Sequence, residues 1–153
     1  MTRTQPLHWK VVVDATDPHH QASFWAETLG YTLEDHSALI AHLLDLGVIT
    51  DADTIEYEGR RAWRGAAAVR HPDDPYAEDS GTGLGRRILF NRVAEPKTGK
   101  NRLHLDVHTG AGERAAEVAR LTALGASVLR EVKEPGGEWV VMTDPERNEF
   151  CVH

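Results

Sequence analysis

Histidine is unusually frequent in this chain, with nine among 153 residues. His104, Asp106 and His108 alternate along the segment LHLDVH (103–108), which is typical of a strand whose successive side chains point to opposite faces. We therefore expect these three side chains on one face, where they can line one cavity. For His108, outward exposure toward the end of the strand is an equal alternative. The excess of histidine makes this face the first place to look for a functional cavity.

Large aromatic side chains give a second chemical signal. Trp25 falls on the apolar face of a predicted helix and is expected in the core. Trp9, Trp63 and Phe90 are candidates for the wall of a cavity instead. Aromatic-lined cavities bind apolar or planar ligands through contact area and stacking, so the sequence predicts a site for a small molecule.

Several other kinds of chemistry lack their motifs. The glycine-rich stretch 81–85 leads into a predicted strand and has no lysine, unlike a phosphate-binding loop. The sequence has no G-x-S-x-G motif, and its single cysteine, Cys151, falls in a predicted strand beside an acidic residue, which disfavours a thiolate. One cysteine also excludes an internal disulfide and a cysteine-rich metal cluster. Nucleotide-driven and acyl-transfer reactions are therefore not expected.

The charge balance limits the partners. Asp and Glu number 24 against 17 Lys and Arg, which leaves a net charge of −7 and an acidic surface that repels nucleic-acid backbones. No apolar run approaches the roughly 20 residues that a membrane span needs. The N-terminal segment MTRTQPLHWK lacks the apolar stretch of a secretory signal. We expect a cytoplasmic protein that binds neither nucleic acid nor membrane.

The first half of the chain shows the elements that must position these residues. A β-branched segment over 8–14 predicts a buried strand, and Asp17 with Pro18 predicts a helix start that ends at Gly30. At most one of the adjacent histidines 19 and 20 is expected to face the core. A second helix over 37–46 and a hairpin turning at residues 58–59 are expected as insertions.

Three further features of the first half follow from composition. His36 and His42 belong to the inserted helix and are expected to be exposed. Strands are expected over 63–69 and 87–93, on either side of a polar loop over 71–85. The inserted helix and this loop are expected to shape any pocket.

The second half repeats the strand–helix pattern, with the helix end displaced by 95 residues, from Gly30 to Gly125. Its predicted elements are a strand over 103–107, a helix over 113–124 and strands over 127–132, 139–143 and 149–152. The chain is therefore expected to be one α+β domain, 1–153, with an N-terminal βαβββ module over 1–95 and a C-terminal one over 101–153. Each module is too small to be stable alone, so we expect a shared interface.

Four segments carry a family resemblance: DPHHQASFWAETLG (17–30), PKTGKNRLHLDV (96–107), LTALGA (121–126) and DPERNEFCV (144–152). Together they resemble the glyoxalase-like branch of the vicinal oxygen chelate superfamily, which includes glyoxalase I, extradiol dioxygenases and bleomycin-resistance proteins. The resemblance implies cupped mixed sheets around a cavity, and a homodimer. The chain departs from the family at Arg147, where DPxGNEF has glycine; we expect Asn148 to take the left-handed conformation instead.

The resemblance also implies where a metal would bind, because metal-using members take ligands from the first and last strands of each module. In the C-terminal module those strands offer His104 and Glu149. The N-terminal module offers only Asn91, a weak amide ligand, unless His8 contributes and completes a set of two histidines and one carboxylate. A divalent ion (Fe, Zn, Ni or Mn) is thus possible at a site that looks incomplete.

An alternative without metal accounts for the same residues. His104 is then a cavity histidine bonded to a neighbouring carboxylate, and Glu149 is paired with a cation, for which the candidates are Arg102, Arg147 and Lys10. In either case the expected ligand-binding cavity is lined by Trp9, Trp63, Phe90, Asn91, Arg102 and Asp106.

Two functions follow from the resemblance. In the first, the protein is a metal-assisted lyase, isomerase or dioxygenase acting between the modules, with Glu149 as a ligand or as the base that moves a proton next to a carbonyl. In the alternative, it is a metal-free protein that sequesters a small molecule, as bleomycin-resistance proteins do. An acidic surface would favour a cationic ligand and aromatic walls a planar one.

Overall fold

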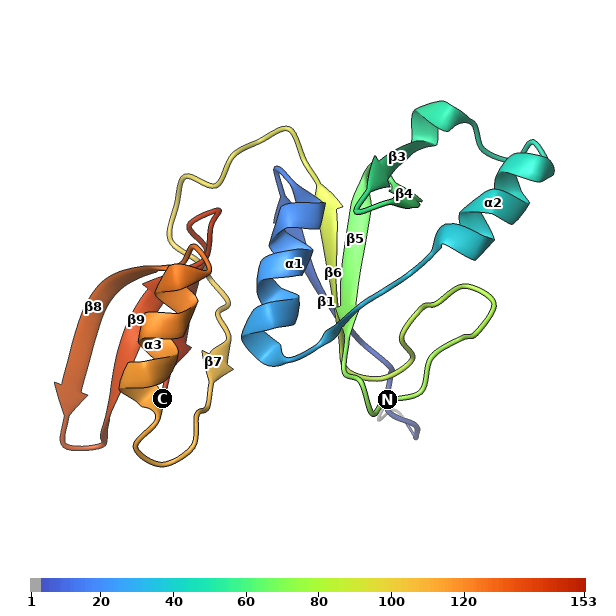
Figure 1. Cartoon of the computed structure of the whole chain (residues 1–153). Helices are drawn as coiled ribbons and strands as arrows, with labels where there is room; N and C mark the ends of the chain where they lie inside the picture. The colour runs from blue at the N-terminus through green and yellow to red at the C-terminus, as the bar shows by residue number, and fades with distance from the viewer. Residues whose placement is uncertain (1–3) are drawn as a thin grey trace.

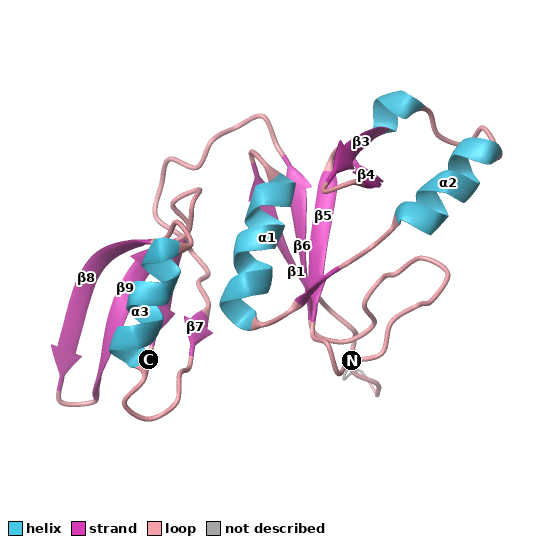
Figure 2. Cartoon of the chain, in the orientation of Figure 1, coloured by secondary structure: helices cyan, strands magenta, loops and turns pink. Residues whose placement is uncertain are grey.

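The computed structural model describes residues 4–153. Two four-stranded sheets stand side by side, each with one helix against it (Figure 1; the secondary structure is coloured in Figure 2). The expected α+β fold of two βαβββ units with cupped mixed sheets is confirmed. None of the helices in the described range is long and apolar enough to cross a membrane. We call residues 11–92, with their sheet and helices, the first module, and residues 106–152, with their sheet and helix, the second module.

The first module begins with the predicted strand and helix. Its elements are β1 (Val11–Ala15), α1 (Pro18–Leu29), β2 (Thr32–Leu33), β5 (Ala66–Arg70) and β6 (Arg87–Arg92). The strands lie in the sheet order β1-β6-β5-β2, and β1 and β6 are parallel. The carboxylate of Asp17 caps α1 by accepting hydrogen bonds from two backbone N–H groups, each at 3.1 Å. Gly30 ends the helix with φ 65°, which glycine adopts without steric cost. Of the two histidines in the first turn, His19 is buried and His20 exposed, as expected.

An insertion separates β2 from β5. It contains α2 (Ser37–Asp45), a 3-10 turn (Asp51–Asp53) and the hairpin of β3 (Thr54–Tyr57) and β4 (Arg60–Trp63). Glu58 and Gly59 have φ 49° and 74°, as the predicted two-residue turn requires. The single strand expected over 63–69 is wrong, because Trp63 ends β4 and β5 begins at Ala66. In Figure 1 the insertion lies on the side of the first module that faces away from the second.

One of the two histidines expected to be exposed in the insertion is covered. His42 is exposed, but the side chain of His36 keeps only 12% of its accessible surface. Glu34 lies against one ring nitrogen and the carbonyl of Ser80, in the loop 71–85, lies against the other. Sequence periodicity could not show this, because the covering residue Ser80 is 44 positions away.

The second module repeats the topology of the first. Its units are β7 (Asp106–Val107), α3 (Arg114–Ala123), β8 (Ser127–Glu134), β9 (Gly137–Thr143) and β10 (Glu149–Val152), in the order β7-β10-β9-β8 with β7 and β10 parallel. The strand expected over 103–107 is shorter than predicted. Only Asp106 and Val107 are paired in register, with Cys151 and Val152 of β10.

Aromatic side chains join the two modules. Phe24 and Trp25 of α1 pack against Phe150 of β10, with ring centroids 6.3 and 5.2 Å apart. Trp25 is a core residue as predicted, and its indole N–H donates to the buried carboxylate of Asp144 at 3.2 Å. The modules therefore share one hydrophobic core.

The turn between β9 and β10 reinforces this joint. The carboxylate of Glu146 accepts hydrogen bonds from the backbone N–H groups of Thr16, at 2.9 Å, and Asp17, at 2.7 Å. A turn of the second module thus accepts hydrogen bonds from backbone N–H groups that precede α1 in the first module. The favourable field of a helix N-terminus for a carboxylate adds to these bonds.

The same turn corrects one expectation. Arg147, not Asn148, takes the left-handed conformation, with φ 69°. Asn148 is fixed by Asp144 instead: its backbone N–H donates to Oδ1 and its amide nitrogen to Oδ2, both at 2.9 Å. The turn therefore keeps the backbone shape that glycine would give, at the cost of a strained arginine.

Candidate functional site

A cavity of about 520 Å³ lies where the two modules meet. The first module contributes β1 and neighbouring side chains of β6 and α1, and the second contributes segment 101–105 and the start of β10. Its volume is that of small-molecule sites in proteins. The predicted site residues that line it are Trp9, Phe90, Arg102, His104 and Glu149.

The other predicted site residues lie elsewhere. Trp63 lines a hollow of about 300 Å³ on the first module, and His8 lines a neighbouring one of about 250 Å³. Asn91 is a residue of β6 paired with Asp14 and with Ala66. The structure therefore distributes the expected aromatic lining over more than one depression.

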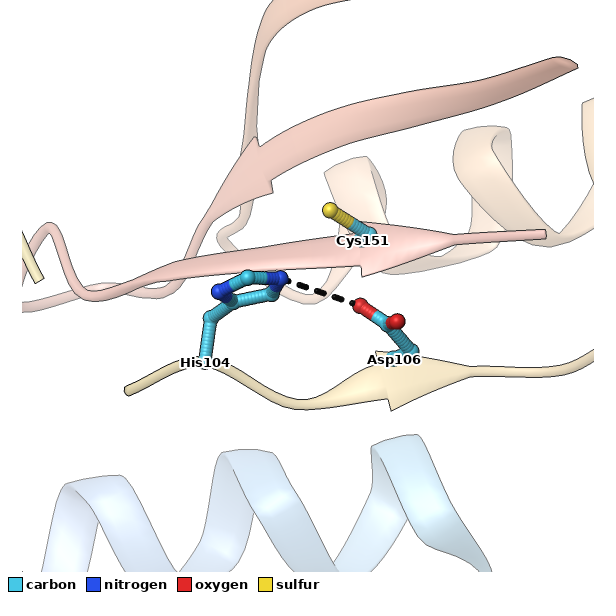
Figure 3. Close-up of side chains that lie close together, drawn as sticks. All are labelled: His104, Asp106 and Cys151. Atoms are coloured by element: carbon cyan, nitrogen blue, oxygen red, sulfur yellow. Dashed lines mark ion pairs between the residues drawn. The ribbon is translucent and has the colours of Figure 1, made fainter. Parts of the chain in front are cut away.

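Three potential metal ligands meet beside the cavity: His104, Asp106 and Cys151 (Figure 3). One ligand atom of each lies within 4.8 Å of the other two. The parallel β7–β10 pair places Cys151 opposite Asp106, and the Cys151 backbone N–H donates to the carbonyl of Leu105 at 2.9 Å. His104 precedes Asp106 by two residues, which lets both side chains share a face. Its Nε2 lies 3.3 Å from Asp106 Oδ1, as expected for a cavity histidine beside a carboxylate.

Further aromatic groups extend this face. Nε2 of His153 lies 3.6 Å from the second carboxylate oxygen of Asp106, and this buried nitrogen has no hydrogen-bond partner among the described residues. The ring of His153 stacks on His108, with centroids 5.0 Å apart, and on Trp139, at 5.7 Å. Asp106 thus lies between two imidazoles, and its two carboxylate oxygens can share a bound cation with them.

Cys151 can serve as a metal ligand only as a thiolate. Burial, and then the negative charge of Asp106, raise the pKa of Cys151, so the free thiol is protonated at neutral pH. A coordinated cation reverses this order, because it deprotonates a thiol that it binds. Imidazole, carboxylate and thiolate together form a ligand set that suits Zn, Ni or Fe(II) better than a purely oxygen-loving ion.

Glu149 has a different partner from those expected. Its carboxylate pairs with Lys100, not with Arg102, Arg147 or Lys10, and the Lys100 hydrogen bond lowers the pKa of Glu149. Within residues 4–153, the ligand group around His104 contains neither Glu149 nor His8. Glu149 is therefore in an ion pair, as the metal-free alternative expects, but its partner is Lys100, which was not among the expected cations.

Cys151 is a potential metal ligand that the sequence interpretation did not include. Residues 149 and 151 alternate on β10, so a ligand expected at Glu149 implied Cys151 on the same face. Which of the two lies opposite the β7 carboxylate depends on strand register, and the sequence alone does not determine that register.

The fold has many solved counterparts. The chain is similar to a glyoxalase/bleomycin resistance protein/dioxygenase family enzyme from Burkholderia phytofirmans PsJN, at 14% identity and a TM-score of 0.58 over 94% of each chain. It is similar to the fosfomycin resistance protein FosX from Mesorhizobium loti, at 9% identity and 0.59 over 99% of this chain and 92% of that one. A mutant FosX from Listeria monocytogenes, complexed with Mn(II) and 1S,2S-dihydroxypropylphosphonic acid, matches at 12% and 0.56, over 94% and 86%.

These identities show a common fold and no more. No functionally curated protein matches the sequence significantly. The model of the glyoxalase-like domain matches residues 10–153, which is nearly the whole chain and includes both modules. The protein therefore belongs to the glyoxalase-like domain family, within the glyoxalase/bleomycin resistance/dioxygenase (vicinal oxygen chelate) fold.

Proposed function

We propose that this protein binds a small organic molecule in the cavity between its modules and holds a divalent metal ion beside that cavity. The observation that carries the proposal is the meeting of His104, Asp106 and Cys151 within 4.8 Å, with His104 also in the cavity wall. The Mn(II) complex of a FosX with the same fold supports a metal in such proteins, although a ligand set with a thiol favours Zn, Ni or Fe(II) here.

The proposed reaction class is a metal-assisted lyase, isomerase or dioxygenase reaction. A bound ion would act as a Lewis acid toward an oxygen of the ligand. The chain's own residues would orient the ligand: Trp9 and Phe90 offer apolar area, and Arg102 offers hydrogen-bond donors. Glu149, kept ionised by Lys100, is a weak base and serves better to position a ligand than to take its proton.

Metal analysis tests this proposal directly. Protein purified without chelators is expected to contain near-stoichiometric Zn, Ni, Fe or Mn by mass spectrometry. His104→Ala and Cys151→Ser should lose most of it, whereas His20→Ala, which removes an exposed histidine from α1, should keep it. Equal metal content in His104→Ala and His20→Ala would contradict the site.

A metal-free binding protein is the second candidate. It is favoured by the apolar residues exposed at the cavity, since Trp9 is 77% and Leu103 87% exposed, and such groups gain from covering by a ligand. In that case a planar organic ligand should raise the melting temperature of chelator-treated protein. Trp9→Ala should abolish the increase.

We also propose a homodimer, on the same exposed residues. Trp9, Val12 and Leu103 are large apolar residues that are exposed around one cavity, and exposed apolar residues gathered in one place mark interaction sites. Sedimentation should give twice the chain mass, and Leu103→Asp should reduce it to the mass of one chain. A monomeric wild-type protein would overturn this assembly without affecting the metal proposal.

A further inference from the structure

We propose that the first module carries a separate site for an organic anion, specifically a carboxylate with an apolar ring, on the face that presents Arg87. The hollows of about 300 and 250 Å³ adjoin here, since Arg87 and Thr82 line both of them. His104, Asp106 and Cys151 line neither hollow, so the inference does not depend on the metal proposal.

The charge of these hollows is opposite to that of the protein. The chain carries −7 overall, yet the titratable side chains in the two walls are His8, Lys10, His36 and Arg87. Neither wall contains an Asp or Glu among the described residues. A cationic depression on an acidic molecule concentrates anions locally and selects against cations.

The buried charges beneath the hollows do not balance. Arg87 donates to Glu34 through Nε at 2.6 Å and Nη2 at 2.8 Å. Both ring nitrogens of His36 face groups that only accept hydrogen bonds: Glu34 Oε2 at 3.1 Å and the Ser80 carbonyl at 2.6 Å. This arrangement favours hydrogen on both nitrogens, and the hydrogen bond to Glu34 raises the pKa of His36. With His36 protonated, two cations share the single carboxylate of Glu34, which leaves one positive charge without a partner.

Neighbouring carboxylates do not supply that partner. Asp35 is paired with Arg60 at 2.9 Å, and Asp74 is paired with Arg86 at 2.7 Å. One donor group of Arg87 is unused, because Nη1 forms no hydrogen bond to any described residue. A ligand carboxylate at the Arg87 face would supply the missing charge and accept from this nitrogen.

The larger hollow suits the rest of such a ligand. Trp63, Leu39 and Leu89 give it apolar walls, and about 300 Å³ accommodates one or two fused rings. The general acidity of the surface predicts a cationic ligand. The charge lining the hollows predicts the reverse, and this local charge acts at contact distance, where screening by salt is weakest.

The experiment uses 2-naphthoate, its neutral amide 2-naphthamide and inorganic phosphate, titrated calorimetrically into the full chain at neutral pH. We expect 2-naphthoate to bind at least about tenfold more tightly than either of the other two, which is about 1.4 kcal/mol. Chemical shifts of the Trp63 indole, assigned with Trp63→Phe, should move with naphthoate. Equal affinity for the amide would overturn the charge argument, and equal affinity for phosphate would overturn the apolar part.

Variants at the rim avoid the folding problem that Arg87→Gln would raise. Lys10 is exposed and lines the smaller hollow, so Lys10→Glu should weaken naphthoate binding several-fold. Lys133→Glu makes the same charge change on β8 of the second module and should leave affinity unchanged. Equal losses in both would refute a local site. His104→Ala should bind naphthoate like the wild type, which separates this test from that of the metal proposal.

Discussion

The substitution Glu34→Gln removes the one carboxylate that holds the buried cations of the first module together. The Glu34 side chain has no accessible surface and accepts from Arg87, His36 and the Gly83 backbone N–H. Burial alone would raise its pKa, but these hydrogen bonds outweigh burial and lower the pKa from 4.5 to about 2. That shift corresponds to about 3 kcal/mol, and allowance for solvent screening leaves about 2 kcal/mol of folding free energy.

The pH dependence of this contribution has a definite sign. Because the folded-state pKa of Glu34 is lowered, its contribution is complete above pH 4.5 and disappears as pH falls toward 2. The hydrogen bond to Glu34 raises the pKa of His36, against the effect of burial. The contribution of His36 is therefore complete below its usual value of 6.5 and is lost as pH rises through the raised pKa. The cluster should stabilise the protein most between pH 4.5 and 6.5.

Urea unfolding, followed by tryptophan fluorescence from pH 2 to 8, measures both effects. At pH 5.5 Glu34→Gln should lose about 2 kcal/mol, a loss that shrinks below pH 4.5. The decline of stability above pH 6.5 should be shallower in the variant, because a neutral amide no longer favours protonated His36. Glu56→Gln, on an exposed position of β3, is the matched control. Losses that are equal in the two variants, or independent of pH, would refute the reasoning.

Two further predictions concern the turn that joins the modules, and both are measured by urea and thermal unfolding. Glu146→Gln weakens the hydrogen bonds from Thr16 and Asp17 and should lower the free energy of unfolding by about 1–2 kcal/mol. A change within about 0.3 kcal/mol would show that this contact between the modules does not contribute to stability. Arg147→Gly removes a side chain from a left-handed position, so it should raise stability by about 1 kcal/mol although one hydrogen bond to the Lys97 carbonyl is lost. A destabilised Arg147→Gly would show that this bond outweighs the strain.

The elements that sequence reasoning located best are those with local signals. Asp17 and Gly30 bound α1 because a cap carboxylate and a left-handed glycine act within a few residues of the helix end. Glu58 and Gly59 likewise determine their own turn. Trp25 was recognisable as a core residue from helical spacing alone.

The parts that could not be predicted depend on contacts between distant segments. His36 is covered by a loop 44 residues away, and Lys100 reaches Glu149 across 49 positions. The position of Cys151 opposite Asp106 depends on the register of β10 against β7, where a shift of one residue would exchange the faces. Periodicity identifies which residues share a face of one strand, but not what that face meets.

The two modules share one topology but present different side chains at equivalent strand positions. In each, the first and last strands run parallel, and one face of the sheet lies against its helix. On the opposite face of the first module the register pairs Val12 with Leu89, both apolar. The corresponding strands of the second module pair Asp106 with Cys151. That face of the first module also pairs Asp14 with Asn91, but within residues 4–153 the group of three potential metal ligands, with atoms within 4.8 Å of one another, lies in the second half of the chain. The same backbone plan thus presents different side chains at equivalent strand positions, and a metal at His104 would take its ligands from the second half alone.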